Sequence, residues 1–229
     1  MRTLAIVPVK TFATAKQRLA DVLARGSRGS LAQAMFSDVL AALTRADEVD
    51  SIAVVTNDLT AETLAVGIAH LLRDEAEAGQ SPAVEIGIRH AQVAGFERAL
   101  LVPGDTPLLD PRELDLVLRR TAHDGVAIAI VPDRHGTGTN GLVLSPPDAM
   151  APSFGPESLA RHVAAAEASG RPHRVEHCES LEHDVDTPED LAALMAAIEA
   201  LRGGAQRTRR ALKQLDRTGS LRALAGAGS

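Results

Sequence analysis

An acidic side chain follows an apolar run in the middle of the chain, where residues 102–111 read VPGDTPLLDP. A Pro-Gly pair ends the run, and Asp105 comes directly after it. Asp110 already precedes Pro111 in the pattern that begins a helix, so Asp105 is left without a capping role. A carboxylate at the end of a buried strand is well placed to ligate Mg²⁺ between substrate oxygens, although an Asp in such a turn can also serve only as a helix cap.

A second pair of acids stands near the carboxyl end of the chain, where Val185 separates Asp184 from Asp186. If this segment is extended, the two carboxylates lie on one face and repel each other unless a cation lies between them or one takes up a proton. A bound metal would relieve that repulsion. The other interpretation makes Asp186 part of the helix start at Thr187, which leaves Asp184 unexplained.

Three cations follow the first apolar run of the chain within nine residues: Lys10, Lys16 and Arg18. No acid stands among them, so they suit the binding of a triphosphate. A solvated polar loop is the alternative interpretation.

Two Gly-rich stretches suggest an anion-recognition pocket. Residues 136–140 read GTGTN and end in Thr139-Asn140, and residues 154–158 read FGPES. Backbone N–H groups of such a loop, and of a helix that begins at Gly155-Pro156, can turn toward an anion. On that helix Ser158, Arg161 and His162 share a face. A hairpin loop and an ordinary helix start would give the same pattern.

A zinc site is a competing hypothesis for the segment that contains His173, His177, Cys178 and His183. A spacing of four between histidines suits zinc on a helix, but RVEHC has the character of a strand. The sequence also has no second cysteine.

The elements that must position these residues alternate between strand and helix patterns. Predicted strands cover 4–9, 51–56, 71–72, 98–102, 126–131, 142–144 and 174–178, and predicted helices cover 30–45, 60–66, 83–95, 111–122, 156–169 and 187–201. This alternation predicts an α/β fold with a mostly parallel central sheet flanked by helices, and ligands beyond the carboxyl ends of its strands. We expect one domain over residues 1–202 and a basic, largely flexible tail over 203–229 with one marginal helix at 207–215.

Composition narrows the function classes. The chain of 229 residues has a net charge of −6, but residues from Arg202 onward carry +6, so residues 1–201 carry −12. An acidic body with 2% aromatic residues and no Trp or Tyr argues against nucleic-acid binding. A single cysteine and the lack of a long apolar stretch predict a cytoplasmic protein with no membrane partner.

Taken in order, several motifs resemble the CofC/FbiD family, the guanylyltransferases of coenzyme F(420) biosynthesis. The motifs are VPVK followed by AKQRL, then PGDTPLL, DRHGTGTNGL, FGPESLARH and DVDTPEDL, and they extend to about residue 200. The resemblance implies a single-domain nucleotidyltransferase of the GT-A-like, Rossmann-like fold. It also implies a Mg²⁺-dependent transfer of GMP from GTP to a phosphorylated three-carbon acid, with release of diphosphate.

For the acceptor, the resemblance favours phosphoenolpyruvate, which would give enolpyruvoyl-2-diphospho-5′-guanosine. The same reaction on 2-phospho-L-lactate or 3-phosphoglycerate is the alternative. By the resemblance, Thr139, Gly155 and Ser158 hold the acceptor, and we add Arg161 to this substrate-binding set. The metals are expected on Asp105, Asp184 and Asp186. Lys10 would bind substrate, and Lys16 and Arg18 would act in catalysis by neutralising the triphosphate.

The sequence departs from the family at one place. Where members usually have a Leu-Asn pair associated with the nucleotide, this chain has Ala83-Val84-Glu85-Ile86, so Glu85 could alter the nucleotide contacts.

A sugar-phosphate or molybdopterin nucleotidyltransferase would need glycines near the first strand, and residues 7–19 contain none. A haloacid-dehalogenase-like phosphatase would need DVDT early in the chain. A non-catalytic nucleotide-binding protein is the alternative outside the enzymes, and hand-over to the next pathway transferase and a homodimer are partner hypotheses.

Overall fold

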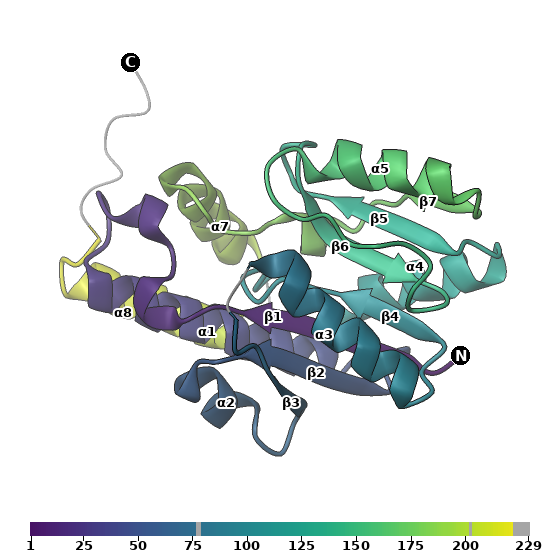
Figure 1. The fold of residues 1–229 in the computed structure, drawn as a ribbon. Helices are drawn as coiled ribbons and strands as arrows, with labels where there is room; N and C mark the ends of the chain where they lie inside the picture. Colours follow the sequence, from purple (N-terminus) through teal and green to yellow (C-terminus); the bar gives the residue numbers. More distant parts are fainter. Residues whose placement is uncertain (77–78, 202, 222–229) are drawn as a thin grey trace.

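Seven strands form one sheet in the computed structural model, which describes residues 1–229 except 77, 78, 202 and 222–229 (Figure 1). The strand order is β3-β2-β1-β4-β6-β5-β7. The strands are β1 Thr3–Val9, β2 Ser51–Thr56, β3 His70–Arg73, β4 Arg98–Leu101, β5 Ile128–Pro132, β6 Thr139–Leu144 and β7 His173–Val175.

Most neighbouring strands run parallel, as the sequence predicts. The exception is β6, which pairs antiparallel with both β4 and β5. Only a short loop separates β5 from β6, and a connection of that length can only return the chain as a hairpin. As a result Thr139, at the start of β6, lies at the same edge of the sheet as the carboxyl ends of the parallel strands.

Helices cover both faces of this sheet. They are α1 Arg25–Leu43, α2 Leu59–Ala65, α3 Gln80–Val93, α4 Pro111–His123, α5 Ser158–Ser169, α6 Glu179–Glu182, α7 Pro188–Ala200 and α8 Gln206–Arg217, with short 3-10 turns η1 Phe12–Thr14 and η2 Gln17–Leu19. Along β1, Ala5 and Val7 face the core beneath α1, whereas Leu4 and Ile6 face α3. In Figure 1, α3 and α5 lie on one side of the sheet. This alternation of apolar residues on both faces is what a doubly covered sheet requires.

Helix starts agree with the sequence where a cap is present. Asp110 accepts the Arg112 N–H at 2.8 Å, and Thr187 and Asp190 form a reciprocal capping box. Elsewhere the boundaries differ: Asp58, not Thr60, caps α2, and β7 ends at Val175, so that Cys178 precedes α6 instead of ending a strand.

The C-terminal segment differs from the expectation of a largely flexible tail. Residues 206–217 form α8, which packs on α1 through Thr208, Leu212 and Leu215. Asp38 of α1 accepts the backbone N–H groups of Arg207 and Thr208 at 3.1 and 2.7 Å. The predicted marginal helix at 207–215 is therefore a docked helix, whose apolar stripe is sparse among many basic residues.

No helix among the described residues is both long enough and apolar enough to cross a membrane.

Candidate active site

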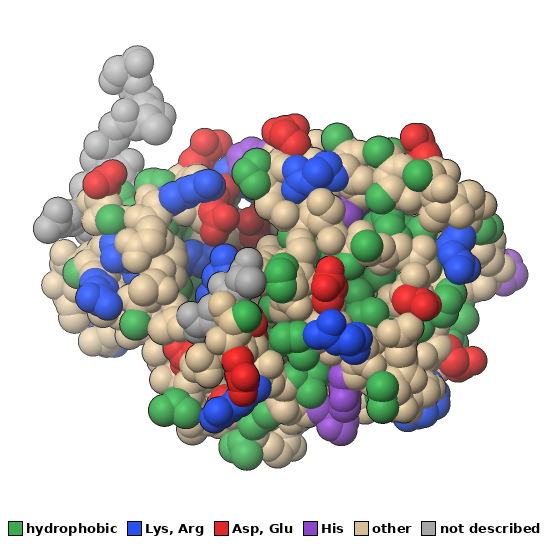
Figure 2. Space-filling model, viewed as in Figure 1, with side chains coloured by type: hydrophobic (Ala, Val, Ile, Leu, Met, Phe, Trp, Pro, Cys, Tyr) green, Lys and Arg blue, Asp and Glu red, His purple; other side chains and the backbone are tan. Residues whose placement is uncertain are grey.

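A pocket of about 460 Å³ opens at the carboxyl ends of β1, β2, β3 and β4. In Figure 2, acidic and basic side chains meet in the recess between the α7 and α5 sides of the molecule. The polar residues that line the pocket are Lys10, Thr11, Thr14, Lys16, Asn57, Asp74, Gln80, Asp105, Thr139, Asn140, Asp184 and Asp186. Residues far apart in sequence thus converge where the topology of an α/β fold favours a ligand.

Lys16 lies between two of the predicted metal ligands. Its ammonium pairs with the Asp105 carboxylate and lies 2.9 Å from Asp186 Oδ1, and its side chain is 7% exposed. Burial favours a lower pKa for this amine, but the charges of Asp105 and Asp186 outweigh it, so the pKa of Lys16 lies above its usual value. Lys16, which directly precedes η2, also adopts a left-handed backbone conformation with φ of 56°. Strain of this kind persists where the surrounding contacts hold it in place.

The segment 184–186 has the alternation that the sequence predicts. Val185 is buried in the core, while Asp184 and Asp186 both line the pocket. Burial raises the pKa of Asp184 to about 6, and the nearby charges of Asp105 and Asp186 act in the same direction. A hydrogen bond from Asn140 Nδ2, at 3.0 Å, and the Lys16 charge offset part of this shift.

Asp190 holds this acidic segment in place from the first turn of α7. Its Oδ2 accepts the N–H groups of Asp186 and Thr187 at 3.0 and 2.7 Å, and its Oδ1 accepts from Arg134 Nη2 at 2.7 Å. Burial favours a higher pKa for Asp190, but the bonds from Thr187 and Arg134 outweigh it and lower the pKa. The loop before β6 and the acidic segment are therefore joined through one carboxylate.

Hard oxygen ligands are what Mg²⁺ prefers, and carboxylates and amide oxygens supply them here. The chemistry of the donor set therefore fits this ion. Within the described part of the chain, however, no three His, Cys, Asp or Glu side chains are grouped closely enough to hold a metal, and the Lys16 ammonium lies between Asp105 and Asp186. The same finding removes support from a zinc site at His173, His177, Cys178 and His183.

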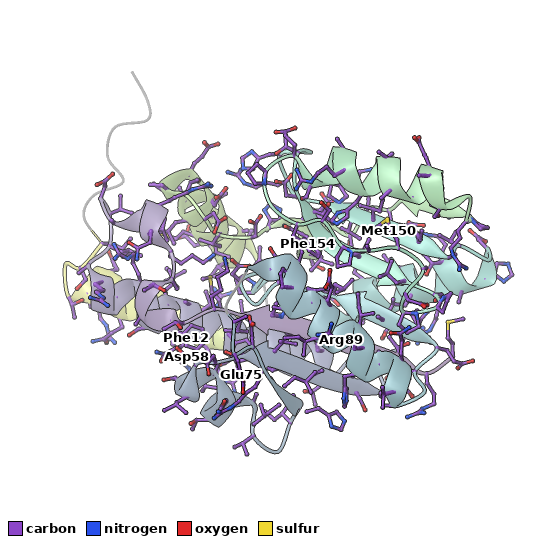
Figure 3. The ribbon with its side chains drawn as sticks, viewed as in Figure 1. Phe12, Asp58, Glu75, Arg89, Met150 and Phe154 are labelled. Atoms are coloured by element: carbon purple, nitrogen blue, oxygen red, sulfur yellow. The ribbon has the colours of Figure 1, made fainter. Side chains whose placement is uncertain are left out.

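The loop after β1, which carries Lys16, also forms other parts of the pocket wall. The Phe12 N–H donates to Asp58 Oδ2 at 2.9 Å, and Oδ1 of the same Asp caps α2. Figure 3 places Phe12 and Asp58 next to each other. Lys10 of this loop lines the pocket. Arg18 is exposed on η2 and does not line the pocket, so its position does not support the predicted catalytic role. Glu85 is exposed on α3 and is also outside the lining.

The residues predicted to bind the acceptor do not all line the pocket. Thr139 lines the pocket, whereas Gly155, Ser158 and Arg161 do not. Ser158 is 2% exposed at the start of α5, and the Arg161 guanidinium binds its own loop, with Nε 3.0 Å from Ser153 Oγ and Nη2 2.9 Å from Ser153 O. Gly155 has φ of +117°, a conformation that favours glycine.

Asn57, Asp74 and Gln80 also line the pocket, although they are not among the residues predicted from the sequence. Asn57 and Asp74 each directly follow a strand, so the rule that drew attention to Asp105 also applied to them. Gln80 begins α3, a helix whose start was predicted three residues later.

Residues 3–222 match the model of a protein family described as "Guanylyl transferase CofC like". The chain belongs to this family. The match extends past residue 200, where the quoted motifs end, and includes α8, so the C-terminal helix has a family counterpart.

Curated relatives carry names of the same kind. A phosphoenolpyruvate guanylyltransferase of Conexibacter woesei is 51% identical over 219 residues, which cover 95% of this chain and 98% of the relative. The protein of the same name in Sphaerobacter thermophilus is 37% identical, over 85% of this chain and 93% of its own.

Solved structures confirm the fold. A nucleotide-diphospho-sugar transferase of Desulfovibrio desulfuricans matches with a TM-score of 0.74 at 18% identity, over 95% of this chain and 96% of that chain. A cytidylyltransferase of Leptospira borgpetersenii matches with a TM-score of 0.62 at 11% identity, over 96% of each chain. The prediction of a nucleotidyltransferase fold, and of an enzyme of the nucleotidyltransferase class, is confirmed.

Proposed function

We propose that this protein transfers GMP from GTP to phosphoenolpyruvate, giving enolpyruvoyl-2-diphospho-5′-guanosine and diphosphate in coenzyme F(420) biosynthesis. The observation that carries the proposal is one pocket that contains the buried Lys16, its partner carboxylates, Thr139 and Lys10. The 51% identity to a phosphoenolpyruvate guanylyltransferase supports the choice of acceptor and nucleotide.

The reaction brings two anions together. An oxygen of the acceptor phosphate attacks the α-phosphorus of GTP, a new phosphorus–oxygen bond forms, and the bond from the α-phosphorus to the bridging oxygen breaks. Diphosphate leaves with the electron pair of that bond. The protein has little covalent chemistry to perform, so positioning and charge neutralisation carry the rate.

Cations must offset the combined phosphate charge. Asp105, Asp184 and Asp186 would hold Mg²⁺, which would supply positive charge between the acceptor phosphate and the α-phosphate when bound. The ammonium of Lys16 is already held at these carboxylates and can turn to a phosphate oxygen. Lys10 would contact the triphosphate from the loop after β1.

The acceptor would lie at the β6 side of the pocket, where Thr139 contributes a hydroxyl. The backbone ties the start of α5 to the loop before β6, because the Leu159 N–H donates to Thr137 O at 3.1 Å. This bond holds the start of α5 beside the loop that leads to Thr139, and we keep Gly155 and Ser158 as proposed acceptor-binding residues at that helix start, since a helix N-terminus favours an anion.

Pyrophosphate release from purified protein tests the proposal. The assay offers GTP and Mg²⁺ with phosphoenolpyruvate, 2-phospho-L-lactate or 3-phosphoglycerate in parallel, and ATP replaces GTP as the nucleotide control. We expect release with phosphoenolpyruvate and GTP. Release with another acid and GTP would keep the reaction class and change the acceptor. Release with ATP but not with GTP would contradict the preference for guanine.

If no pyrophosphate is released with any of the three acids because the product stays bound, the next transferase of the pathway will restore release, so the assay is repeated with that enzyme present. No release in that assay either would overturn the proposal in favour of nucleotide binding without turnover. Hand-over to that transferase and a homodimeric state stay predictions. We also propose a cytoplasmic location, which the free and buried thiol of Cys178 supports.

A further inference from the structure

His162 lies on α5 with no exposed surface and uses both of its ring nitrogens. Its Nε2 is 2.8 Å from the backbone N of Ser153. A backbone N–H can only donate, so Nε2 must accept this bond and carry no proton. The Phe154 ring packs against the imidazole with the ring centroids 4.9 Å apart, which closes this side to water.

The second ring nitrogen contacts Thr139. Nδ1 of His162 is 2.9 Å from Thr139 Oγ1. Burial, with the nearby Arg161 charge in second place, lowers the pKa of His162 to about 4, so the ring is neutral at physiological pH. A neutral imidazole whose Nε2 is unprotonated carries its proton on Nδ1. The bond therefore runs from Nδ1–H of His162 to Oγ1 of Thr139.

This direction decides what the Thr139 hydroxyl can do. Because its oxygen accepts from His162, its own hydrogen must point elsewhere. Thr139 lines the pocket, and among the described residues its hydroxyl has no second hydrogen-bond partner. A threonine hydroxyl can act as donor or acceptor, and here the histidine leaves it as a donor toward the pocket.

We propose that His162 is a positioning residue that fixes the Thr139 hydroxyl as a hydrogen-bond donor to the anionic acceptor. The inference rests on the proposed function for the identity of that acceptor, but not for the direction of the bond. An anion needs donors, so a hydroxyl whose hydrogen is aimed at it is worth more than one free to rotate. His162 acts only through Thr139, since it does not line the pocket itself.

Two variants separate the two bonds of the ring. In H162N the side-chain amide nitrogen can stand where Nδ1 stands and still donate to Thr139, but the bond from Ser153 is lost. In H162Q the side-chain oxygen can reach the place of Nε2 and accept from Ser153, but the donor to Thr139 is lost. The pair is matched because each variant removes one bond and keeps the ring's other role.

Steady-state kinetics then distinguish positioning from general support of the fold. We expect H162Q to raise the KM for phosphoenolpyruvate by about 10-fold, with the KM for GTP within about twofold of the wild type. H162N should stay closer to the wild type in the KM for phosphoenolpyruvate. The reverse order, or equal rises in both KM values, would overturn the inference.

A double-mutant cycle tests whether the histidine acts through the threonine. T139V removes the hydroxyl, so adding H162Q to it should cost no further acceptor affinity. If the effects of T139V and H162Q simply add, His162 acts independently of Thr139 and the proposal fails.

The tautomer can be measured without any turnover, on wild-type protein labelled with ¹⁵N-histidine. We expect one histidine to show a protonated Nδ1 and an unprotonated Nε2 at neutral pH, and this signal to disappear in H162Q. A protonated Nε2 at that residue would overturn the inference even if the transferase activity is found. If this protein shows the expected tautomer but does not use phosphoenolpyruvate, the direction of the bond is upheld and the proposed acceptor is refuted. The tautomer is read from the wild type, and a variant is needed only to assign the signal, for which H162N serves if H162Q fails to fold.

Discussion

The two sides of the pocket are built on different principles. On one side, Lys16, Asp105, Asp184 and Asp186 are charged, and their positions depend on one another. On the other side, Thr139 is neutral, as is His162, which binds Thr139 without lining the pocket, and the bonds of His162 have a defined direction.

The difference teaches how the site divides its tasks. Three carboxylates beside one ammonium leave an excess of negative charge. Burial is the first cause of the raised pKa of Asp184, and the charges of Asp105 and Asp186 add to it. Such a cluster gains from a bound cation and loses stability without one. The neutral side carries no such charge repulsion, and the two hydrogen bonds of the His162 ring hold its geometry. Charge neutralisation thus lies on one side and orientation on the other.

The largest effect should come from the charged side. Asp105→Asn removes one negative charge and one ligand oxygen, so we expect turnover at saturating Mg²⁺ to fall by ~100-fold or more. Pyrophosphate release measures it. Asp148→Asn, at an exposed position outside the pocket, is the matched control and should lose far less. Near-wild-type turnover of the Asp105 variant would refute Asp105 as a metal ligand.

Lys16 and Arg18 give a direct comparison between a buried and an exposed cation. Lys16→Met leaves the carboxylates of Asp105 and Asp186 without their partner, and we expect turnover to fall by ~10-fold to 100-fold. Arg18→Ala should stay within about twofold, because its side chain lies outside the pocket. Comparable losses in both variants would restore the catalytic role predicted for Arg18.

Asp184→Asn should stabilise the folded protein while it lowers activity. The folded state holds the Asp184 proton up to a pKa of about 6, against an ordinary value of 3.8. Between these two pKa values the folded state binds the Asp184 proton more tightly than the unfolded state does. The free energy of unfolding of the wild type therefore falls as the pH rises through this range. The decrease is about 3 kcal/mol above a pH of about 6 and absent below a pH of about 3.8.

Urea unfolding in metal-free buffer measures this effect. The variant should be more stable than the wild type at about pH 7.5 and equal to it at about pH 3.5. If Asp184→Asn is less stable than the wild type at about pH 7.5, the ionised Asp184 carboxylate does not destabilise the folded protein. The comparison of the two proteins at each pH cancels the titration of groups that they share.

The smallest effect should arise far from both sides of the pocket. Asp38→Asn weakens the acceptor for the first N–H groups of α8, and we expect a loss of about 1 kcal/mol in the free energy of unfolding. Pyrophosphate release should remain unchanged. A loss of activity in a variant that is fully folded would mean that α8 contributes to the site.

The acidic residues that follow strands can be predicted from the sequence. Asp105 and the Asp184–Asp186 pair were identified because strand ends, caps and the i, i+2 alternation are local properties that follow from the order of residue types. The same local rules gave the capping residues Asp110 and Thr187, and most strands to within one or two residues. The family motifs then supplied the reaction class.

Tertiary structure alone decided which of these residues meet. The ion pairs of Lys16 with Asp105 and Asp186 join positions 89 and 170 residues apart, and nothing in the local sequence distinguishes Lys16 from Arg18. The docking of α8 on Asp38 and the direction of the His162–Thr139 bond likewise depend on segments that only folding brings together. The sequence by itself determined the residue types, the elements and the fold class, because these follow from short-range propensity and periodicity. The partners of each charged and polar group were decided by the fold, because hydrogen bonds and ion pairs depend on distances of a few ångströms that the chain order does not contain.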